Sequence, residues 1–262
     1  MNTLGRSFFC VSISLLGLAF EWHPPETADQ LALLRLQVDG SLPQTRQLAP
    51  ERDLQLGETI AVADLRLPVP AAKELRLSLK RFHSGDLRDS ARHLEEAILI
   101  DDTIPVAHYN LGICYLHLGQ YEKAMSEFQK ASAQDSRSIQ SRIGLTEALF
   151  ILKRYEEAET AARGAYQLDA VNPDVRYLLG RIWAAEGRDG PEVFEMLRAS
   201  RTQFPPAHLV LASLLLKHRA TDAAISELRE YLNRPGAPDE DKVACMIQVL
   251  SQPGSASTCA VN

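Results

Sequence analysis

A leucine recurs along this sequence at an almost constant interval. Successive occurrences are separated by 34, 34, 34 and 32 residues, at Leu77, Leu111, Leu145, Leu179 and Leu211. The residue after each leucine is small or short: Ser78, Gly112, Thr146, Gly180 and Ala212. A period of this length indicates a repeat protein, in which each unit buries its apolar face against its neighbours. This repeat constrains the fold more than any other feature of the chain.

Further columns recur with the same period in the second half of each unit. One column of small residues comprises Ser90, Ala124, Ala158, Glu192 and Ala224, and another comprises Ala97, Ala131, Ala165, Ala199 and Tyr231. A larger residue lies between them in most units, at Leu94, Phe128, Met196 and Leu228, with Ala162 in the third. Residues three, four and seven positions apart share one helical face, so these columns predict a second helix packed closely on the first. Because Glu192 interrupts its column, we expect the fourth unit to pack irregularly.

Prolines and glycines occupy equivalent places in several units. A proline stands at the entry of three first helices, where its missing N–H costs nothing: Pro105, Pro173 and Pro205. A glycine stands at the turn inside three units, where a left-handed backbone is convenient: Gly85, Gly119 and Gly187. Each unit is therefore predicted to be a helix, a tight turn and a second helix.

Residues 105–138 carry the whole pattern, with Leu111-Gly112, Tyr115, Gly119, Tyr121, Ala124, Phe128 and Ala131 in order. In these residues the chain resembles the tetratricopeptide repeat (TPR) family, and the resemblance covers about 71–238. It implies an all-α fold, an α-solenoid of about five helix-turn-helix repeats at 71–104, 105–138, 139–172, 173–204 and 205–238. Residues 239–250 begin with acidic residues and predict a C-terminal capping helix, whose apolar face comprises Val243, Met246, Ile247 and Leu250.

Residues 1–20 differ in kind from the repeats. Arg6 precedes the uncharged run 7–20, and Gly17-Leu18-Ala19 offers a small-x-small cleavage site. This arrangement favours a secretory signal peptide, with a membrane anchor or a buried amino-terminal helix as alternatives. The stretch that leads into the repeats also resembles that of exported bacterial TPR proteins. We therefore expect an exported protein of the periplasm or cell envelope, or else one that is membrane-anchored and associates with the membrane through this segment.

Residues 21–70 contain six prolines and no long apolar stripe at helical spacing. Two short stretches alternate as strands do, at 34–38 and 63–67, but two short strands do not form a stable domain. We expect an extended Pro-containing strap or linker laid on the first repeat. Residues 251–262 are expected to form a disordered tail.

The composition argues against several classes of function. The chain is 45% hydrophobic and 24% charged, and 28 Lys plus Arg against 34 Asp plus Glu give a net charge of −6. Without clustered cations, nucleic-acid binding is not expected. No nucleotide-binding, serine-hydrolase or zinc-protease motif occurs. The cysteines lack metal-ligand spacing, Cys114 fits a packed helix position, and His108 and His208 occupy equivalent packing places. We therefore expect no enzyme, no cofactor and no metal.

The TPR resemblance places a partner-binding groove on the first helices, which line the concave side of such a solenoid. The residues implied are Leu75, Leu79, Phe82, Tyr109, Ile113, Leu116, His117, Ile143, Phe150, Tyr177 and Arg181, with Gln140 and Glu147 on the same face. This largely apolar surface favours a scaffold that binds a hydrophobic segment of a protein or peptide. Alternatively, the strap itself fills the groove through Leu65, Leu67 and Val69, or the chain is a non-catalytic accessory subunit of an envelope enzyme or secretion complex.

The groove does not match chaperone-binding TPR domains, which hold a carboxylate-ended peptide with Lys, Arg and Asn side chains. Asn110 matches one of these places, but the others hold Leu75, Leu79, Gln140 and Gly144. Since cations are missing from these places, we do not expect recognition of a carboxylate pair.

Overall fold

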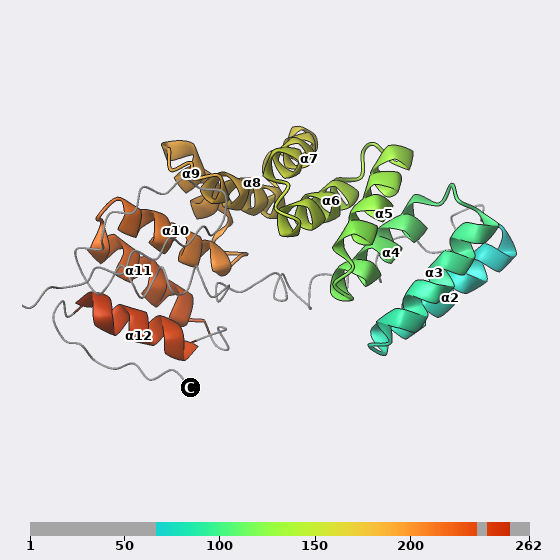
Figure 1. Ribbon diagram of the computed structural model, residues 1–262, viewed down its shortest axis with the longest axis horizontal. Coiled ribbons are helices and arrows are strands. Elements are labelled where there is room, and N and C mark those ends of the chain that lie inside the picture. The colour runs from blue at the N-terminus through green and yellow to red at the C-terminus, as the bar shows by residue number, and fades with distance from the viewer. Residues whose placement is uncertain (1–66, 235–239, 252–262) are drawn as a thin grey trace, which may run out of the picture.

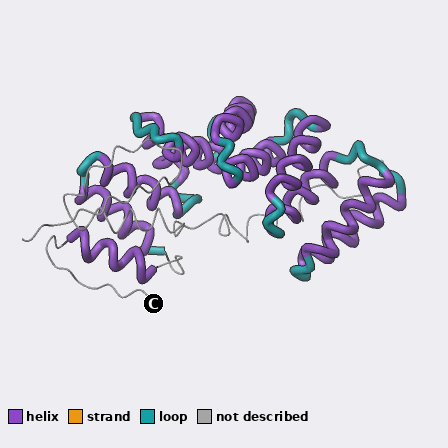
Figure 2. Tube along the Cα trace, in the orientation of Figure 1, coloured by secondary structure: helices purple, strands orange, loops and turns teal. Residues whose placement is uncertain are grey.

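The computed structural model describes residues 67–234 and 240–251, and every regular element in these ranges is an α-helix (Figure 2). The helices are α2 (Val69–His83), α3 (Leu87–Ile100), α4 (Pro105–His117), α5 (Tyr121–Gln134), α6 (Ile139–Ile151), α7 (Tyr155–Leu168), α8 (Pro173–Ala185), α9 (Pro191–Ser200), α10 (Pro206–Lys217), α11 (Thr221–Leu232) and α12 (Glu240–Ser251). Helices α2 to α11 pack as consecutive pairs, one for each expected repeat, with α2 beginning slightly before its repeat. The protein is therefore an all-α solenoid, as the sequence predicted.

The stacked pairs form an arch (Figure 1). First helices of successive pairs contact one another, α4 with α6, α6 with α8 and α8 with α10. Within the described ranges no comparable contact joins successive second helices. The layer of first helices is therefore the inner one, and the solenoid curves toward it. Helices α2, α4, α6, α8 and α10 thus supply the concave surface.

Phe128 on α5 shows why small residues recur on the first helices. Its fully buried ring lies between Gly112 of α4 and Gly144 of α6. A Cβ atom at Gly112 would come within 2.7 Å of the Phe128 ring, and one at Gly144 within 2.5 Å, which is closer than van der Waals contact allows. The two glycines therefore let one aromatic side chain fill the space between two units.

Each helix pair contains one left-handed residue at the same place in its turn. In three pairs it is a glycine, with φ of 80°, 73° and 81° at Gly85, Gly119 and Gly187. Lys153 and Arg219 occupy this place in the other two pairs, with φ of 60° and 59°. A left-handed conformation costs a non-glycine residue about 1 kcal/mol. The packing of the two helices therefore imposes the turn geometry even where glycine is missing.

The fourth pair corrects the columns expected from the sequence. Val193, Leu197 and Ser200 are the fully buried residues of α9, whereas Glu192 and Ala199 are exposed. The buried face is thus displaced by one residue from the expected one. Glu192 does not interrupt the small column, because it lies outside it.

The turn before α9 explains this displacement. Three residues, 118–120, separate α4 from α5, whereas five residues, 186–190, separate α8 from α9. The longer turn moves the start of α9 to Pro191 and shortens the helix to 10 residues. Leu197 then occupies the place that Phe128 has in the second pair, against Gly180.

Helix α12 covers the apolar end of the last pair. Val243, Met246 and Leu250 are buried in one cluster with Leu228 and Tyr231 of α11, and Ile247 packs against the same cluster. All four residues of the expected apolar face therefore contribute to the contact. Covering the last apolar face in this way is what a capping helix does in a repeat array.

The expectations for residues 1–66 and 252–262, namely the signal or anchor, most of the strap and the tail, lie outside the described residues. At the border, Leu67 packs against the cluster of α2, α3 and α4, whereas Val69 is 79% exposed and fills no groove. In the described part of the chain, no helix has both the length and the apolar character that a membrane span requires.

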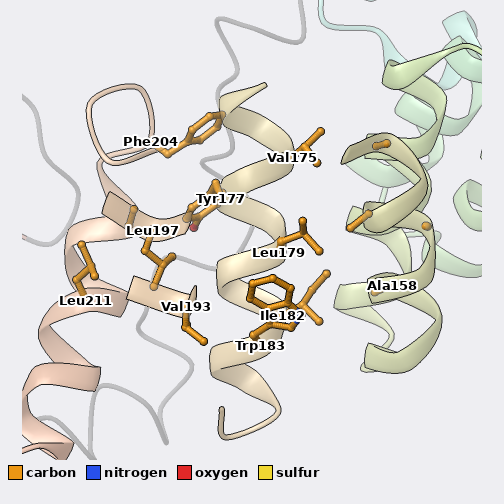
Figure 3. Close-up of a cluster of buried hydrophobic side chains, with 14 of the residues drawn as sticks. Ala158, Val175, Tyr177, Leu179, Ile182, Trp183, Val193, Leu197, Phe204 and Leu211 are labelled. Atoms are coloured by element: carbon orange, nitrogen blue, oxygen red, sulfur yellow. The ribbon is translucent and has the colours of Figure 1, made fainter. Parts of the chain in front are cut away.

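Helix α8 lies at the centre of the largest buried cluster (Figure 3). Val175 and Leu179 point toward α7, and Leu197 and Leu211 approach from α9 and α10 on the other side. Tyr177 and Phe204 stack with their rings 5.0 Å apart and nearly parallel. The position of α8, and with it the centre of the concave surface, is thus fixed by helices on both sides.

Glu159 of α7 adds a polar connection to α8. It accepts hydrogen bonds from Trp183 Nε1 at 2.7 Å and from Arg188 at 2.6 and 3.1 Å, and it pairs with Arg163 at 2.7 Å. Burial alone would raise the pKa of Glu159, but the hydrogen bonds from Arg188, Trp183 and Arg163 outweigh it and lower the pKa to about 2. The ionised carboxylate therefore stabilises the fold.

Replacing Glu159 with glutamine is expected to lower the free energy of unfolding by about 2 kcal/mol at pH 7. Because the folded pKa lies below the unfolded value, the contribution is fully present above about pH 4.5 and is lost as the pH falls toward 2. Urea unfolding at pH 7 and pH 3 should thus show a smaller difference between variant and parent at pH 3. Glu156→Gln, at an exposed position of α7, is the control, and its free energy of unfolding should match that of the parent at both pH values.

Candidate partner-binding surface

The concave layer carries one group of the expected residues on α2 and α4. Phe82, Tyr109 and Leu116 are partly buried and pack against the buried cluster that contains Ile113 and Phe128. The exposed His117 at the end of α4 meets Phe82 edge to face, with 6.2 Å between ring centroids. One apolar patch, which we call the α2–α4 patch, is thus formed by Phe82, Tyr109, Ile113, Leu116 and His117.

A second group lies on α6 and α8. The guanidinium carbon of Arg181 is 3.8 Å from the ring centroid of Phe150 and 5.7 Å from that of Tyr177. A guanidinium nitrogen of Arg181 also donates to Glu147 Oε1 at 3.4 Å. Ring faces attract a cation, so the guanidinium is fixed by both rings and by the carboxylate. We call Glu147, Phe150, Tyr177 and Arg181 the α6–α8 patch.

The electrostatics of the α6–α8 patch follow from its burial. The side chains of Arg181 and Glu147 are only 12% and 8% exposed. Burial opposes the charge of Arg181, but Glu147 and Tyr177 beside it keep its pKa above the usual value. Burial likewise raises the pKa of Tyr177. The patch therefore contains an internal ion pair whose charges offset each other, and its outer surface is suited to an apolar ligand.

Three of the expected groove residues lie in the core. Leu75, Ile113 and Tyr177 are 3%, 4% and 4% exposed, so they support the concave surface from beneath and do not form its outer face. They are buried because each first helix also packs on its own partner helix and on the next unit. Leu79 and Ile143 remain partly exposed.

Two aromatic residues that the sequence did not assign to the surface help to build it. Tyr155 packs on Phe150 with 5.4 Å between ring centroids, and Phe204 stacks on Tyr177. Phe204 stands 100 residues after Ile104, its equivalent in the second repeat. Its equivalents in the third and fourth repeats, Ser138 and Asn172, are polar, so only the structure shows that the Phe204 ring lies against Tyr177.

The residues considered for chemistry have packing partners. His108 and His208 are buried, and each Nδ1 lies 2.6 Å from a glutamate on the partner helix, Glu127 or Glu227. The hydrogen bond to Glu127 raises the pKa of His108. Burial raises the pKa of the Cys114 thiol to about 11, so this side chain is a neutral packing group at pH 7.

The sequence and the fold were compared with known proteins. The profile of a family described as anaphase-promoting complex, cyclosome, subunit 3, matches residues 88–165. A thermophilic TPR protein of Thermus thermophilus superposes with a TM-score of 0.55 at 20% identity, over 70% of this chain and 100% of that one. PilF of Pseudomonas aeruginosa superposes with a TM-score of 0.57 at 23% sequence identity, over 69% of this chain and 90% of PilF. MamA of Desulfovibrio magneticus RS-1 superposes with a TM-score of 0.58 at 17% identity, over 66% of this chain and 99% of MamA. No curated protein sequence matches significantly.

The repeat columns, the helix pairs and these similarities define the chain as a tetratricopeptide-repeat solenoid. Proteins of this class present an extended concave surface for interactions with other proteins. At this level of identity, the solved structures show the fold alone.

Proposed function

We propose that this protein is a non-enzymatic scaffold that binds a hydrophobic segment of a partner protein along its concave surface. The observation that carries the proposal is the α2–α4 patch, where Phe82, Tyr109 and Leu116 are partly exposed on the inner helix layer. An apolar patch rimmed by polar residues is typical of a protein-binding site. The α6–α8 patch lies on the same layer, where the partly exposed Phe150 continues the apolar surface.

The experiment that tests this proposal places a photoreactive amino acid on each side of the solenoid in the full-length chain. Gln140 is exposed on α6 and shares a helical face with Ile143 and Glu147, so it reports on the concave surface. Gln129 is exposed on α5 and serves as the matched position on the outer layer. We expect the probe at Gln140 to form a cross-link to a discrete protein, which mass spectrometry identifies, and the probe at Gln129 to form none.

Affinity for the cross-linked partner gives the second readout. Because a carboxylate placed against an apolar ligand must lose its hydration, Gln140→Glu is expected to weaken binding at least tenfold, or by about 1.4 kcal/mol. Gln129→Glu introduces the same charge on the outer layer and should leave the affinity unchanged. Equal cross-linking at both positions, or equal loss of affinity in both variants, would place the binding surface elsewhere.

We further propose that the chain is exported. The apolar run 7–20 and the small-x-small site Gly17-Leu18-Ala19 near its end support this proposal. The mass of the protein purified from an envelope fraction tests this. A chain that retains its first 20 residues in the cytoplasmic fraction would contradict export.

If the cross-linked partner is an enzyme whose activity depends on this chain, the accessory-subunit alternative gains support over that of a general scaffold.

A further inference from the structure

The first helix pair contains a cluster of metal-ligating side chains on the surface between α2 and α3. Glu74 of α2 and His93 and Glu96 of α3 each offer one ligand atom, and these atoms all lie within 4.8 Å of one another. His93 Nδ1 is 2.7 Å from Glu74 Oε2 and 3.8 Å from Glu96 Oε2. Three potential ligands thus converge from two helices, with the imidazole of His93 buried between the carboxylates.

The equivalent positions in the second repeat carry the opposite charges. Glu74, His93 and Glu96 each stand 34 residues before their equivalents, which are His108, Glu127 and Lys130. In the second repeat, Glu127 accepts from both cationic side chains, at 2.6 Å from His108 and 2.7 Å from Lys130. In the second repeat, the Glu127 carboxylate thus lies between two cationic side chains. In the first repeat, the His93 imidazole lies between two carboxylates instead. The position of Lys130 is therefore occupied by a second carboxylate, that of Glu96, in the first repeat.

The fifth repeat shows a different solution. His208 and Glu227 repeat the histidine–glutamate contact at 2.6 Å, and Arg201 donates to the other oxygen of Glu227 at 2.9 Å. Both other histidine–glutamate pairs thus have a cationic side chain on the glutamate's second oxygen. The first repeat differs from the second and the fifth in one respect. There, two carboxylates approach the same histidine nitrogen, since Glu74 and Glu96 both lie near His93 Nδ1.

The remaining polar contacts lie on the outer sides of the cluster. Arg92 contacts Glu96 Oε1 at 2.6 Å and His93 Nε2 at 3.1 Å, and Lys73 lies 3.9 Å from Glu74 Oε1. Asp89 Oδ2 is 3.8 Å from His93 Nε2 and 2.6 Å from Arg81 Nε. The Oε2 atoms of both glutamates are therefore turned toward His93 Nδ1, while their Oε1 atoms face cations.

We propose that Glu74, His93 and Glu96 bind a divalent transition-metal ion, with zinc as the best-suited ion, and so connect α2 to α3. One imidazole nitrogen and two carboxylate oxygens are a donor set that suits zinc, and a fourth position is left for water. Ligand atoms around a tetrahedral zinc ion lie about 3.3 Å apart, which falls between the 2.7 and 3.8 Å measured here.

The role that we propose for this site is structural. A bound ion would offset the repulsion between the two carboxylates and hold the first helix pair together through ligands on both helices. Because the ion binds the folded pair, zinc is expected to raise the melting temperature of the protein. The proposal is independent of what the concave surface binds.

The test uses the full-length chain, freed of metal with a chelator and titrated with zinc chloride at pH 7 in a calorimeter. We expect one site per chain with micromolar affinity. Glu96→Gln removes one anionic ligand and should weaken binding at least tenfold, and Glu96→Lys, which copies the second repeat, should abolish it. The Glu96 side chain is 43% exposed, so both variants should fold, which circular dichroism checks.

Glu230→Lys is the matched control, since Glu230 is exposed and occupies in the fifth repeat the position that Glu96 has in the first. It makes the same charge change and should leave zinc affinity and the zinc-induced rise in melting temperature intact. Absence of zinc binding by the parent protein would overturn the proposal. So would binding that persists in Glu96→Lys, or that falls equally in Glu230→Lys.

Discussion

Replacing Phe128 with alanine is expected to lower the free energy of unfolding by about 3–5 kcal/mol. The ring is fully buried and fills the space between Gly112 and Gly144, so its removal leaves a cavity lined by two helix backbones that cannot collapse into it. Because Phe128 contacts two successive units, the loss should reduce the stability of both. Urea unfolding followed by circular dichroism gives the magnitude.

A double-mutant cycle with Gly144 isolates the contact. Gly144→Ala alone should destabilise the protein, because the new Cβ would lie 2.5 Å from the Phe128 ring. In the Phe128→Ala background the same change places a methyl group in the cavity and should be neutral or stabilising. A change of sign between the two backgrounds is the expected result. Additive effects would show that the ring does not lie against Gly144.

Replacing Arg181 with methionine is expected to cost about 3–5 kcal/mol of stability, the range found when one partner of a buried ion pair is removed. Methionine retains apolar contact with Phe150 and Tyr177, so the loss reports mainly on Glu147, whose carboxylate loses a cationic partner in a buried place. Thermal unfolding of the parent and the variant provides the measurement.

The control for Arg181 is the paired replacement. Arg181→Met combined with Glu147→Gln removes both charges and should recover much of the loss, since the remaining buried group is neutral. Arg198→Met, on an exposed arginine 5.6 Å from the ring centroid of Phe194, tests whether loss of a cation–π contact alone explains the effect. If Arg198→Met costs as much as Arg181→Met, the buried ion pair is not the cause.

The repeat columns predicted the fold because the same packing problem is solved in every unit. Wherever two helices cross closely, a residue such as Gly112 or Ala124 must be small, and that requirement is visible in the sequence at constant spacing. The capping helix was predictable for a related reason, since its buried residues Val243, Met246 and Leu250 repeat at helical spacing.

The displacement of α9 was not predictable from the columns. Aligning the fourth unit by its period places Glu192, Met196 and Ala199 on the buried face, and each is a plausible member of its column. The actual buried residues lie one position later, because the residues before Pro191 lengthen the turn. A fixed period carries no information about a turn that lengthens while the helix after it shortens.

The surface residues were only partly predictable, because the family geometry selects a helical face but not the depth of each side chain. Leu75 and Tyr177 lie on the selected face and are nevertheless buried by neighbouring helices. The cluster of Glu74 with His93 and Glu96 could not be predicted from a motif, because its residues come from two helices and match no short sequence pattern. The signal that was present is the exchange of glutamate and histidine between positions 74 and 93 and their equivalents, 108 and 127.

The short helix α9 has a consequence for how the array unfolds. Its contact with α10 is less extensive than the corresponding contacts of α3 with α4 and of α5 with α6. In a linear array, stability is the sum of each unit's own stability and its coupling to its neighbours, so the weakest junction sets where cooperativity breaks. We expect α10 to α12 to open at lower denaturant than α2 to α8. Because Leu211 of α10 still packs in the cluster around α8, we expect the short α9 to affect the order in which the array unfolds and not the shape of the folded arch.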